Sequence, residues 1–299
     1  MTVGFSASLS VSIADLPTAV SFSQQVEAFG YDGVAVQDHP YRPDFGESWT
    51  LLSYIAGQTD RLKLLINVAC LPVRSPAMVA KAAATLDHLT GGRVELGLGA
   101  GWFWDGIASM GFERRTPGES VSALEEAIEV TRLAWREGET VSFSGDYYRL
   151  TDFRAGPAGA HPIAVYLGAL GPRMLRLTGR SADGWTISRV SPAEVRERRQ
   201  LVDQAAEGSG RAPGSIRTQY NFIGHLADTT GRAFEGPAEY WVELLSEYLA
   251  AGVNEFLFAP GVPFDGPQPF RAMDPPEALE QLQHFAEQVI PHLRSGLGA

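Results

Sequence analysis

The chain contains a single cysteine, Cys70, among its 299 residues. One cysteine excludes an intramolecular disulfide and is typical of proteins in a reducing compartment, so we expect a cytoplasmic protein. No apolar run approaches the ~18 residues that a membrane-spanning helix needs. The N-terminal residues also lack the basic flank of a secretory signal. We therefore expect no membrane partner and no secretory leader.

Positive charge is also scarce, with 24 Lys and Arg against 35 Asp and Glu, and the formal net charge is −11. Proteins that bind nucleic acid carry a basic footprint, so this balance argues against a nucleic-acid partner. An acidic chain can still bind a small anion locally, through backbone amides and a single arginine. We expect a small-molecule substrate.

Residue patterns for metal and nucleophile chemistry are missing. No GxSxG elbow is present, so a serine hydrolase is not indicated. Cys70 ends an apolar segment without a basic neighbour, which predicts an inert buried thiol. The spacings HxH and HxxxH, which are common in metal sites, do not occur among the six histidines, so we expect no metal site. These histidines are His39, His88, His161, His225, His284 and His292.

Strand-like and helix-like segments alternate along the whole chain. Alternation of this kind indicates a parallel sheet, and eight such pairs favour a closed barrel over an open sheet. We predict one α/β domain over residues 1–299, a single (β/α)8 TIM-type barrel. The predicted strands cover 3–9, 33–37, 62–71, 93–99, 162–168, 183–188, 216–226 and 254–260. The predicted helices cover 15–29, 49–56, 76–88, 119–135, 172–180, 192–207, 238–251 and 276–293.

Three irregular segments, 100–117, 227–237 and 259–275, follow predicted strands. We expect all three on the C-terminal rim of the barrel, where barrel enzymes carry their active sites. A further insertion covers 137–161, and its YYRL stretch is a candidate extra strand.

Two glycine-rich loops lie on the predicted rim. Residues 97–102 read GLGAGW, which does not match the GxGxxG fingerprint of dinucleotide-binding proteins. Its glycines would either let a flat ligand lie against bare backbone or allow strands to pack closely. Residues 167–173 read LGALGPR and open a helix at Pro172. This second loop fits an anion cradle assisted by Arg173, and it fits a plain strand–helix turn equally well.

An acid and an imidazole, Asp38 and His39, end the apolar run GVAV in the stretch GVAVQDHP. Such a pair is either a polar turn with a surface histidine or part of an active site. An imidazole ordinarily has a pKa of ~6.5, so it can exchange a proton near neutral pH. Asp38 could orient His39 or raise its basicity. Because the pair lies on the predicted rim, we favour catalytic roles for His39 and Asp38.

Four stretches together carry a resemblance to a known family: DHP (38–40), RSPAMVAKAAATLDHLTGGRVELGLGAGW (74–102), LEEAIEVTRLAW (124–135) and GPRMLRLTGRSADGW (171–185). They resemble the luciferase-like monooxygenase superfamily, and in particular its branch that uses the deazaflavin coenzyme F420. The resemblance implies a TIM-type barrel that holds an isoalloxazine-like ring at its C-terminal rim.

The resemblance also implies roles for individual residues. His39, beside Asp38, would lie at the ring and transfer protons. The cofactor-binding residues at the ring would be Ala100 and Gly101, together with Ile66, Asn67 and Val68 at a strand bulge that contains a non-proline cis peptide bond. The cofactor phosphate would be bound by Gly168, Leu170, Gly171 and Pro172, and Arg173 would assist in binding it.

One departure concerns the substrate. Sugar-phosphate dehydrogenases of this branch place a carboxylate where this sequence has Trp102, followed by Phe103 and Trp104. We therefore expect an apolar or aromatic substrate, with Trp102 and Trp104 in its pocket. The same aromatic residues would also fit a packed rim or a dimer contact, and we expect a homodimer.

The resulting prediction is an oxidoreductase that transfers a hydride between coenzyme F420 and a small organic substrate. The first alternative is an FMN-dependent monooxygenase on the same fold. A second is a flavin-binding barrel without catalysis. A third, hydrolysis by two rim carboxylates, would use Asp38 and Asp105.

Overall fold

The computed structural model describes residues 3–263 and 270–295. Eight parallel strands of this part close into a barrel, because β9 pairs with both β8 and β11, and β1 pairs with both β2 and β11. These strands are β1 (Gly4–Leu9), β2 (Gly33–Val36), β3 (Lys63–Cys70), β4 (Val94–Gly99), β7 (Val165–Gly168), β8 (Gly184–Ser188), β9 (Arg217–Leu226) and β11 (Glu255–Pro263). The predicted fold class is confirmed.

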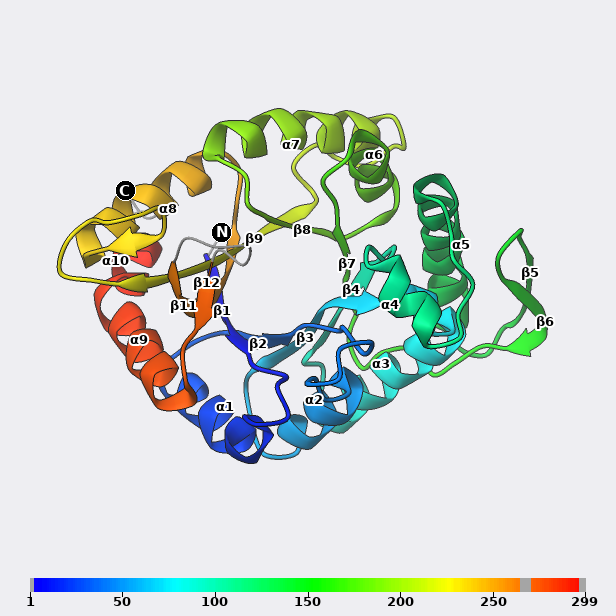
Figure 1. The fold of residues 1–299 in the computed structure, drawn as a ribbon. Coiled ribbons are helices and arrows are strands. Elements are labelled where there is room, and N and C mark those ends of the chain that lie inside the picture. Colours follow the sequence, from blue (N-terminus) through cyan, green and yellow to red (C-terminus); the bar gives the residue numbers. More distant parts are fainter. Residues whose placement is uncertain (1–2, 264–269, 296–299) are drawn as a thin grey trace.

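Helices surround the barrel as an outer ring (Figure 1). They are α1 (Ala19–Ala28) with the preceding 3-10 turn η1 (Leu16–Thr18), α2 (Ser48–Ala56), α3 (Pro76–Thr90) after η2 (Leu71–Val73), α5 (Pro117–Ala134), α6 (Pro172–Ser181), α7 (Pro192–Glu207), α8 (Ala238–Ala250), α9 (Pro275–Gln288) and α10 (Ile290–Ser295). The predicted last helix, 276–293, is wrong as one unit, because it breaks at Val289. Pro291 explains the break, since its ring cannot continue a helix from the preceding turn.

Two of the helices begin at capping boxes. In α5, Thr116 accepts the Glu119 backbone N–H while Glu119 accepts that of Thr116, and Pro117 occupies the first turn. Ser191 and Glu194 repeat this arrangement at α7. A capping box satisfies two backbone donors that have no helical acceptor. It also places the start of α5 two residues before the predicted position.

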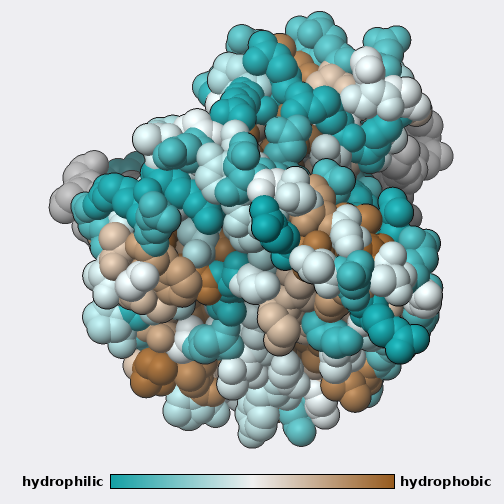
Figure 2. Space-filling model, turned by 90° about the vertical axis from the view of Figure 1, so that its right-hand side faces the viewer, coloured by the Kyte–Doolittle hydropathy of each residue, from teal (hydrophilic) through white to brown (hydrophobic). Residues whose placement is uncertain are grey.

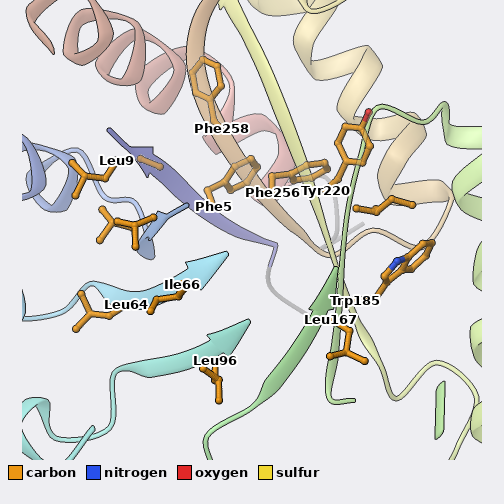
Figure 3. Packing of buried hydrophobic residues seen from close by; sticks show 14 of the residues in the cluster. Phe5, Leu9, Leu64, Ile66, Leu96, Leu167, Trp185, Tyr220, Phe256 and Phe258 are labelled. Carbon is orange, nitrogen blue, oxygen red and sulfur yellow. The ribbon is translucent and has the colours of Figure 1, made fainter. Parts of the chain in front are cut away.

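Apolar side chains form two separate cores. The larger one lies between barrel and helices, where Phe5 stacks on Phe256 at a centroid distance of 5.4 Å (Figure 3). Alternation along β1 buries Phe5, Ala7 and Leu9. The smaller core, inside the barrel, consists of Ala35, Leu65, Ala164, Tyr166 and Leu257.

A polar network closes the amino-terminal end of the barrel. Arg217 donates to Glu95 at 3.1 Å and to Glu255 at 3.2 Å, and its guanidinium lies over the Tyr166 ring at 4.8 Å. Tyr166 in turn donates to Glu255 at 2.7 Å. The floor of the barrel is therefore held by paired charges.

The irregular segments 100–117 and 227–237 begin at the carboxyl ends of β4 and β9, as predicted, whereas the third begins later than the predicted residue 259, because β11 continues to Pro263. The first contains the short helix α4 (Trp104–Ser109), which the sequence did not indicate, and the second ends in β10 (Glu235–Gly236). In the third, β11 pairs with the antiparallel β12 (Phe270–Ala272), and residues 264–269 lie outside the described part of the chain.

The further insertion forms a hairpin of β5 (Thr140–Ser144) and β6 (Arg149–Arg154). The YYRL stretch predicted as a strand overlaps only the start of β6, because the carboxylate of Glu126 binds the N–H groups of Asp146, Tyr147 and Tyr148 and holds them as a turn. The hairpin is thereby tied to α5.

The face drawn in Figure 2 is largely hydrophilic, and its apolar residues lie in several separate groups. Among the described residues, no helix is both long and apolar enough to cross a membrane.

Candidate active site

A cavity of about 520 Å³ opens at the carboxyl ends of the barrel strands. Its walls come from the ends of β3, β4, β7 and β8 and from the segment after β2, with α5 and α6 at its edge. Predicted site residues that line it are Asp38, His39, Asn67, Val68, Ala100, Gly101, Trp102, Trp104, Gly168, Leu170 and Gly171. Residues from four separate stretches of sequence therefore meet at one place.

His39 presents one ring nitrogen to this cavity. Its Nδ1 shares a 2.8 Å hydrogen bond with the hydroxyl of Tyr41, which also lines the cavity. In the described part of the chain, Nε2 has no hydrogen-bond partner. Occupation of Nδ1 by Tyr41 fixes the ring orientation, so Nε2 is the nitrogen available to a substrate.

Aromatic rings surround the imidazole. Tyr41, Phe45 and Trp102 have ring centroids 5.6, 6.2 and 6.5 Å from that of His39. Burial by these neighbours lowers the pKa of His39, and this outweighs the opposing charge of Asp38. Burial likewise raises the pKa of Tyr41 to about 12. At neutral pH the pair is therefore a neutral imidazole beside a neutral phenol.

Of the two roles predicted for Asp38, the orientation of His39 is wrong, whereas its charge does raise the pKa of His39, although the effect of burial is larger. Asp38 is 1% exposed, and its carboxylate accepts from the Cys70 N–H at 2.8 Å and from Arg74 at 2.7 and 2.8 Å. Arg74 also donates to Glu47 at 2.6 Å. Asp38 therefore joins the end of β2 to the end of β3, and its two oxygens are taken by these donors rather than by the imidazole.

Cys70 is a buried free thiol, as predicted. Burial, together with the charge of Asp38, raises its pKa to about 12. The reactive thiolate is thus disfavoured at neutral pH.

The predicted bulge occurs in β3, where the register with β4 shifts between Ile66 and Ala69. The Asn67–Val68 peptide bond in the bulge is cis. Asn67 Oδ1 is buried and has no hydrogen-bond partner among the described residues, although the side chain lines the cavity. A buried acceptor of this kind is paired in most proteins, so it marks a position for a ligand donor.

Of the two roles considered for the glycines of GLGAGW, close packing of strands is the one that Gly97 and Gly99 have. A Cβ on Gly97 would collide with the carbonyl oxygen of Ile66, and a Cβ on Gly99 would lie 2.6 Å from Val68 Cγ2. Gly101 has a φ of +86°, a conformation that side chains disfavour. These glycines admit the β3 bulge and a turn, and Val68 then fills the space in front of them.

The loop before α6 keeps the features of an anion site. Gly171 is the N-cap of α6, and a Cβ there would meet no atom within 4 Å. Pro172 has no N–H, and the backbone N–H groups of Arg173 and Met174 have no backbone acceptor in the described residues. Free amides at a helix N-terminus favour a phosphate or carboxylate.

Three predicted site residues lie apart from the cavity walls. Arg173 donates to Gly118 O at 2.8 Å and to Ser122 Oγ at 2.7 Å, so its guanidinium joins α6 to α5. Ile66 is 1% exposed and packs in the core between barrel and helices. Pro172 is exposed at the first turn of α6. None of these three residues lines the cavity.

Trp102 remains 76% exposed although it lines the cavity beside His39. Phe103 packs between Trp102 and Tyr41, at centroid distances of 5.9 and 5.4 Å. Trp104 begins α4 and lines the cavity as well. The aromatic segment after β4 thus forms one wall of the entrance.

The two carboxylates considered for hydrolysis do not form a pair. Asp38 is bound by Arg74 inside the rim, whereas Asp105 has a 77% exposed side chain that pairs with Arg114. An acid–base pair for hydrolysis needs two carboxylates that flank one ligand position. The hydrolytic alternative is therefore wrong.

Sequence reasoning missed several residues of the site. Tyr41 is two residues from His39, and this proximity was an available signal. Arg74 lies 36 residues from its partner Asp38, and no local pattern connects them. Thr186 and Asn221, which bond to each other in the wall, come from β8 and β9 and carried no motif.

Comparison with known proteins agrees with this geometry. The family described as "Luciferase-like monooxygenase" matches residues 1–284. An F420-dependent glucose-6-phosphate dehydrogenase of Amycolatopsis mediterranei is 30% identical over 292 residues, which cover 92% of this chain and 86% of that protein. A phthiodiolone/phenolphthiodiolone dimycocerosates ketoreductase of Mycobacterium kansasii is 38% identical over 191 residues, covering 62% of this chain and 51% of that protein.

Solved structures share the fold. An F420-dependent secondary alcohol dehydrogenase, in complex with an F420–acetone adduct, superposes with a TM-score of 0.84 at 19% identity. The superposition covers 98% of this chain and 100% of that one. With the family match over residues 1–284 and the full-length relative at 30% identity, the chain belongs to the luciferase-like monooxygenase family of enzymes.

Proposed function

We propose that this enzyme transfers a hydride between the deazaflavin coenzyme F420 and a small apolar or aromatic organic substrate. One observation carries the proposal: His39, the loop before α6 and Asn67, whose Oδ1 has no partner among the described residues, line the same cavity. The full-length relative named as an F420-dependent dehydrogenase supports the choice of cofactor.

The wall residues fit such a cofactor. Asn67 Oδ1 would accept from a ring N–H, and Val68 with Ala100 offers an apolar surface to a flat ring. The N–H groups of Arg173 and Met174 would take the phosphate, since they have no backbone acceptor among the described residues. When bound, the deazaflavin supplies a carbon that accepts or delivers hydride.

His39 would move the proton that accompanies the hydride. In the oxidation of an alcohol, the hydroxyl proton would pass to Nε2 and the hydride on the carbon that bears the hydroxyl would pass to the bound cofactor. The products would be a carbonyl compound, an imidazolium and the reduced cofactor. Tyr41 holds the ring throughout by its bond to Nδ1. The lowered pKa of His39 keeps the imidazole neutral, and therefore able to accept this proton, at neutral pH.

The description of the family favours a second candidate, an FMN-dependent monooxygenase. The same cavity would then hold the isoalloxazine of FMN. Oxygen activation by reduced FMN would require a site that is protected from water, whereas Trp102 at this entrance is 76% exposed. This exposure leads us to prefer hydride transfer.

Parallel titrations of the purified protein with F420 and FMN, followed by cofactor fluorescence, test the proposal. We expect saturable F420 binding that is tighter than FMN binding by about tenfold or more. Reduced F420 should then be oxidised by a surrogate enone or quinone. Tighter FMN binding, together with oxygen uptake by the FMN-loaded protein, would establish the monooxygenase instead. Binding of F420 without turnover of any surrogate would contradict catalysis.

A further inference from the structure

A second cavity, of about 650 Å³, adjoins the first on the side of β8, β9 and β11. The two share His39, Asn67, Trp102, Leu170, Ser188 and Asn221. A ligand in the second cavity therefore lies beside His39 without contacting Gly171 or Met174 at the start of α6. This position suits the substrate of the proposed reaction.

Most of the second cavity is apolar. Its aromatic wall consists of Tyr220, Phe222 and Phe234, in which Phe234 stacks on Phe222 at 5.9 Å and on Tyr220 at 6.2 Å. Val36 and Leu257 complete it from β2 and β11. Rings and aliphatic groups of this kind match a hydrocarbon or aromatic body in the ligand.

Two arginines lie on one side of this apolar cavity. Arg198, from α7, donates to Glu194 at 3.3 Å through Nη2, whereas its Nη1 is buried without a partner in the described residues. Arg189 follows β8, and its guanidinium has no hydrogen bond or ion pair within the described part. A buried guanidinium nitrogen without an acceptor is costly, so Arg198 has an unfilled place for an oxygen ligand.

The backbone at Arg189 supports this interpretation. Its φ is +58°, a conformation in which non-glycine residues are uncommon. Glycine would adopt it at no steric cost, so the presence of arginine is consistent with a use for the side chain. Among the described residues that line the cavity, Glu194 is the one carboxylate, and the two guanidinium groups beside it leave these three side chains with a single positive charge.

We propose that this second cavity binds a substrate with an apolar or aromatic body and one carboxylate, which pairs with Arg198 and Arg189. The inference rests on the proposed function for the reaction, although carboxylate binding itself needs no cofactor. Guanidinium groups bind carboxylates with two parallel hydrogen bonds, which Arg198 Nη1 and the guanidinium of Arg189 can supply.

The test uses the purified protein without cofactor and three probes: benzoate, phenylacetate and 3-phenylpropionate, each against its neutral amide. Binding is followed by tryptophan fluorescence, because Trp102 lines the cavity. We expect at least one carboxylate to bind more tightly than its amide by about tenfold, or ~1.4 kcal/mol. In Arg198→Gln and in Arg189→Gln this preference should fall to about twofold or less.

Arg176→Gln, at an exposed arginine of α6 that lines neither cavity, serves as the matched control and should keep the preference. If Arg198→Gln does not fold, Arg198→Lys retains the charge, and the exposed Arg189 still gives an independent result. Equal binding of carboxylates and amides, or an unchanged preference in both variants, would overturn the proposal.

F420 titration of the same variants separates this inference from the proposed function. Unchanged F420 affinity in Arg198→Gln and Arg189→Gln is expected. A parallel loss of F420 affinity would assign the arginines to the anionic tail of the cofactor and overturn the substrate proposal. If the wild type fails to bind F420 but keeps the carboxylate preference, the proposed cofactor is wrong and the carboxylate site stands.

Discussion

At the scale of single residues, His39 is the group on which the proposed reaction depends. Replacement by asparagine removes the proton acceptor, and general acid–base catalysis is worth ~10²–10⁴ in rate. We expect His39→Asn to reduce turnover by about that factor while F420 affinity changes only a few-fold. Steady-state kinetics and an F420 titration measure the two effects. His292→Asn, at an exposed position in α10, should change neither.

The pH profile of oxidation adds a second signature. Burial lowers the pKa of His39, so the neutral form persists below the ordinary value and is lost only as the pH falls through the lowered pKa. The wild-type rate should therefore fall on the acid side, at a pH below about 6.5. In His39→Asn this acid limb should disappear. A mutant profile that retains the limb would assign it to another group.

Tyr41 should act as a positioning residue. Tyr41→Phe removes one hydrogen bond to Nδ1, which is worth about 1 kcal/mol, so turnover should fall by about fivefold to tenfold. Because His39 remains, the acid limb of the pH profile should persist, which distinguishes this variant from His39→Asn. Wild-type turnover in Tyr41→Phe would show that ring packing alone orients the imidazole.

Asp38 should matter more for stability than for proton transfer. Asp38→Asn removes the charge that pairs with Arg74, whose side chain is 17% exposed, and breaking such a pair costs about 3 kcal/mol. Urea unfolding measures the loss. Asp44→Asn, which breaks the exposed pair with Arg42, should cost less than about 1 kcal/mol. Equal effects of the two variants would contradict a structural role for Asp38.

The sequence indicated that Asp38 and His39 belong to the rim, but it could not assign their partners. A carboxylate next to an imidazole in sequence need not face it, since neighbouring side chains leave a strand end in different directions. Here Arg74 takes the carboxylate and Tyr41 takes Nδ1. Both pairings depend on how β2 meets β3, which is a property of the folded barrel.

At the scale of elements, α6 offers a separable test of cofactor binding. A Cβ on Gly171 meets no neighbour, so Gly171→Asp should fold. An N-cap carboxylate would bond to the first-turn amides and stabilise the helix, yet it would occupy the proposed phosphate site. We expect F420 affinity to fall by about tenfold or more, with the melting temperature unchanged or raised.

Gly171→Ala is the matched control and should keep the affinity, because it adds bulk without charge. Full affinity in Gly171→Asp would place the cofactor phosphate elsewhere.

The strands, helices and rim segments near this site were largely predictable from apolar periodicity and proline positions. The hairpin turn at 145–148 was not, because Glu126, in another element, holds it.

For the whole molecule, the floor of the barrel should contribute stability without affecting the active site. Arg217→Met leaves Glu95, which is 8% exposed, with only Lys63 at 3.7 Å as a charged partner among the described residues. Loss of one member of a buried ion pair typically costs about 3 kcal/mol or more, although the 33% exposure of the Arg217 side chain reduces this to about 2 kcal/mol. Chemical unfolding should show this loss with F420 affinity unchanged. A change in F420 affinity without a loss of stability would contradict this role of Arg217.

The closure of the barrel has a consequence for how the protein is made. β1 is hydrogen-bonded on one side to β2 and on the other to β11, so Gly4 pairs with Glu255. At translation rates of about 5–20 residues per second, β11 leaves the ribosome about 10–45 s after β2. For that interval β1 presents an open edge, at which strands from other chains can add. Nascent chains halted before β11 should therefore bind chaperones or aggregate, whereas chains released after it should not.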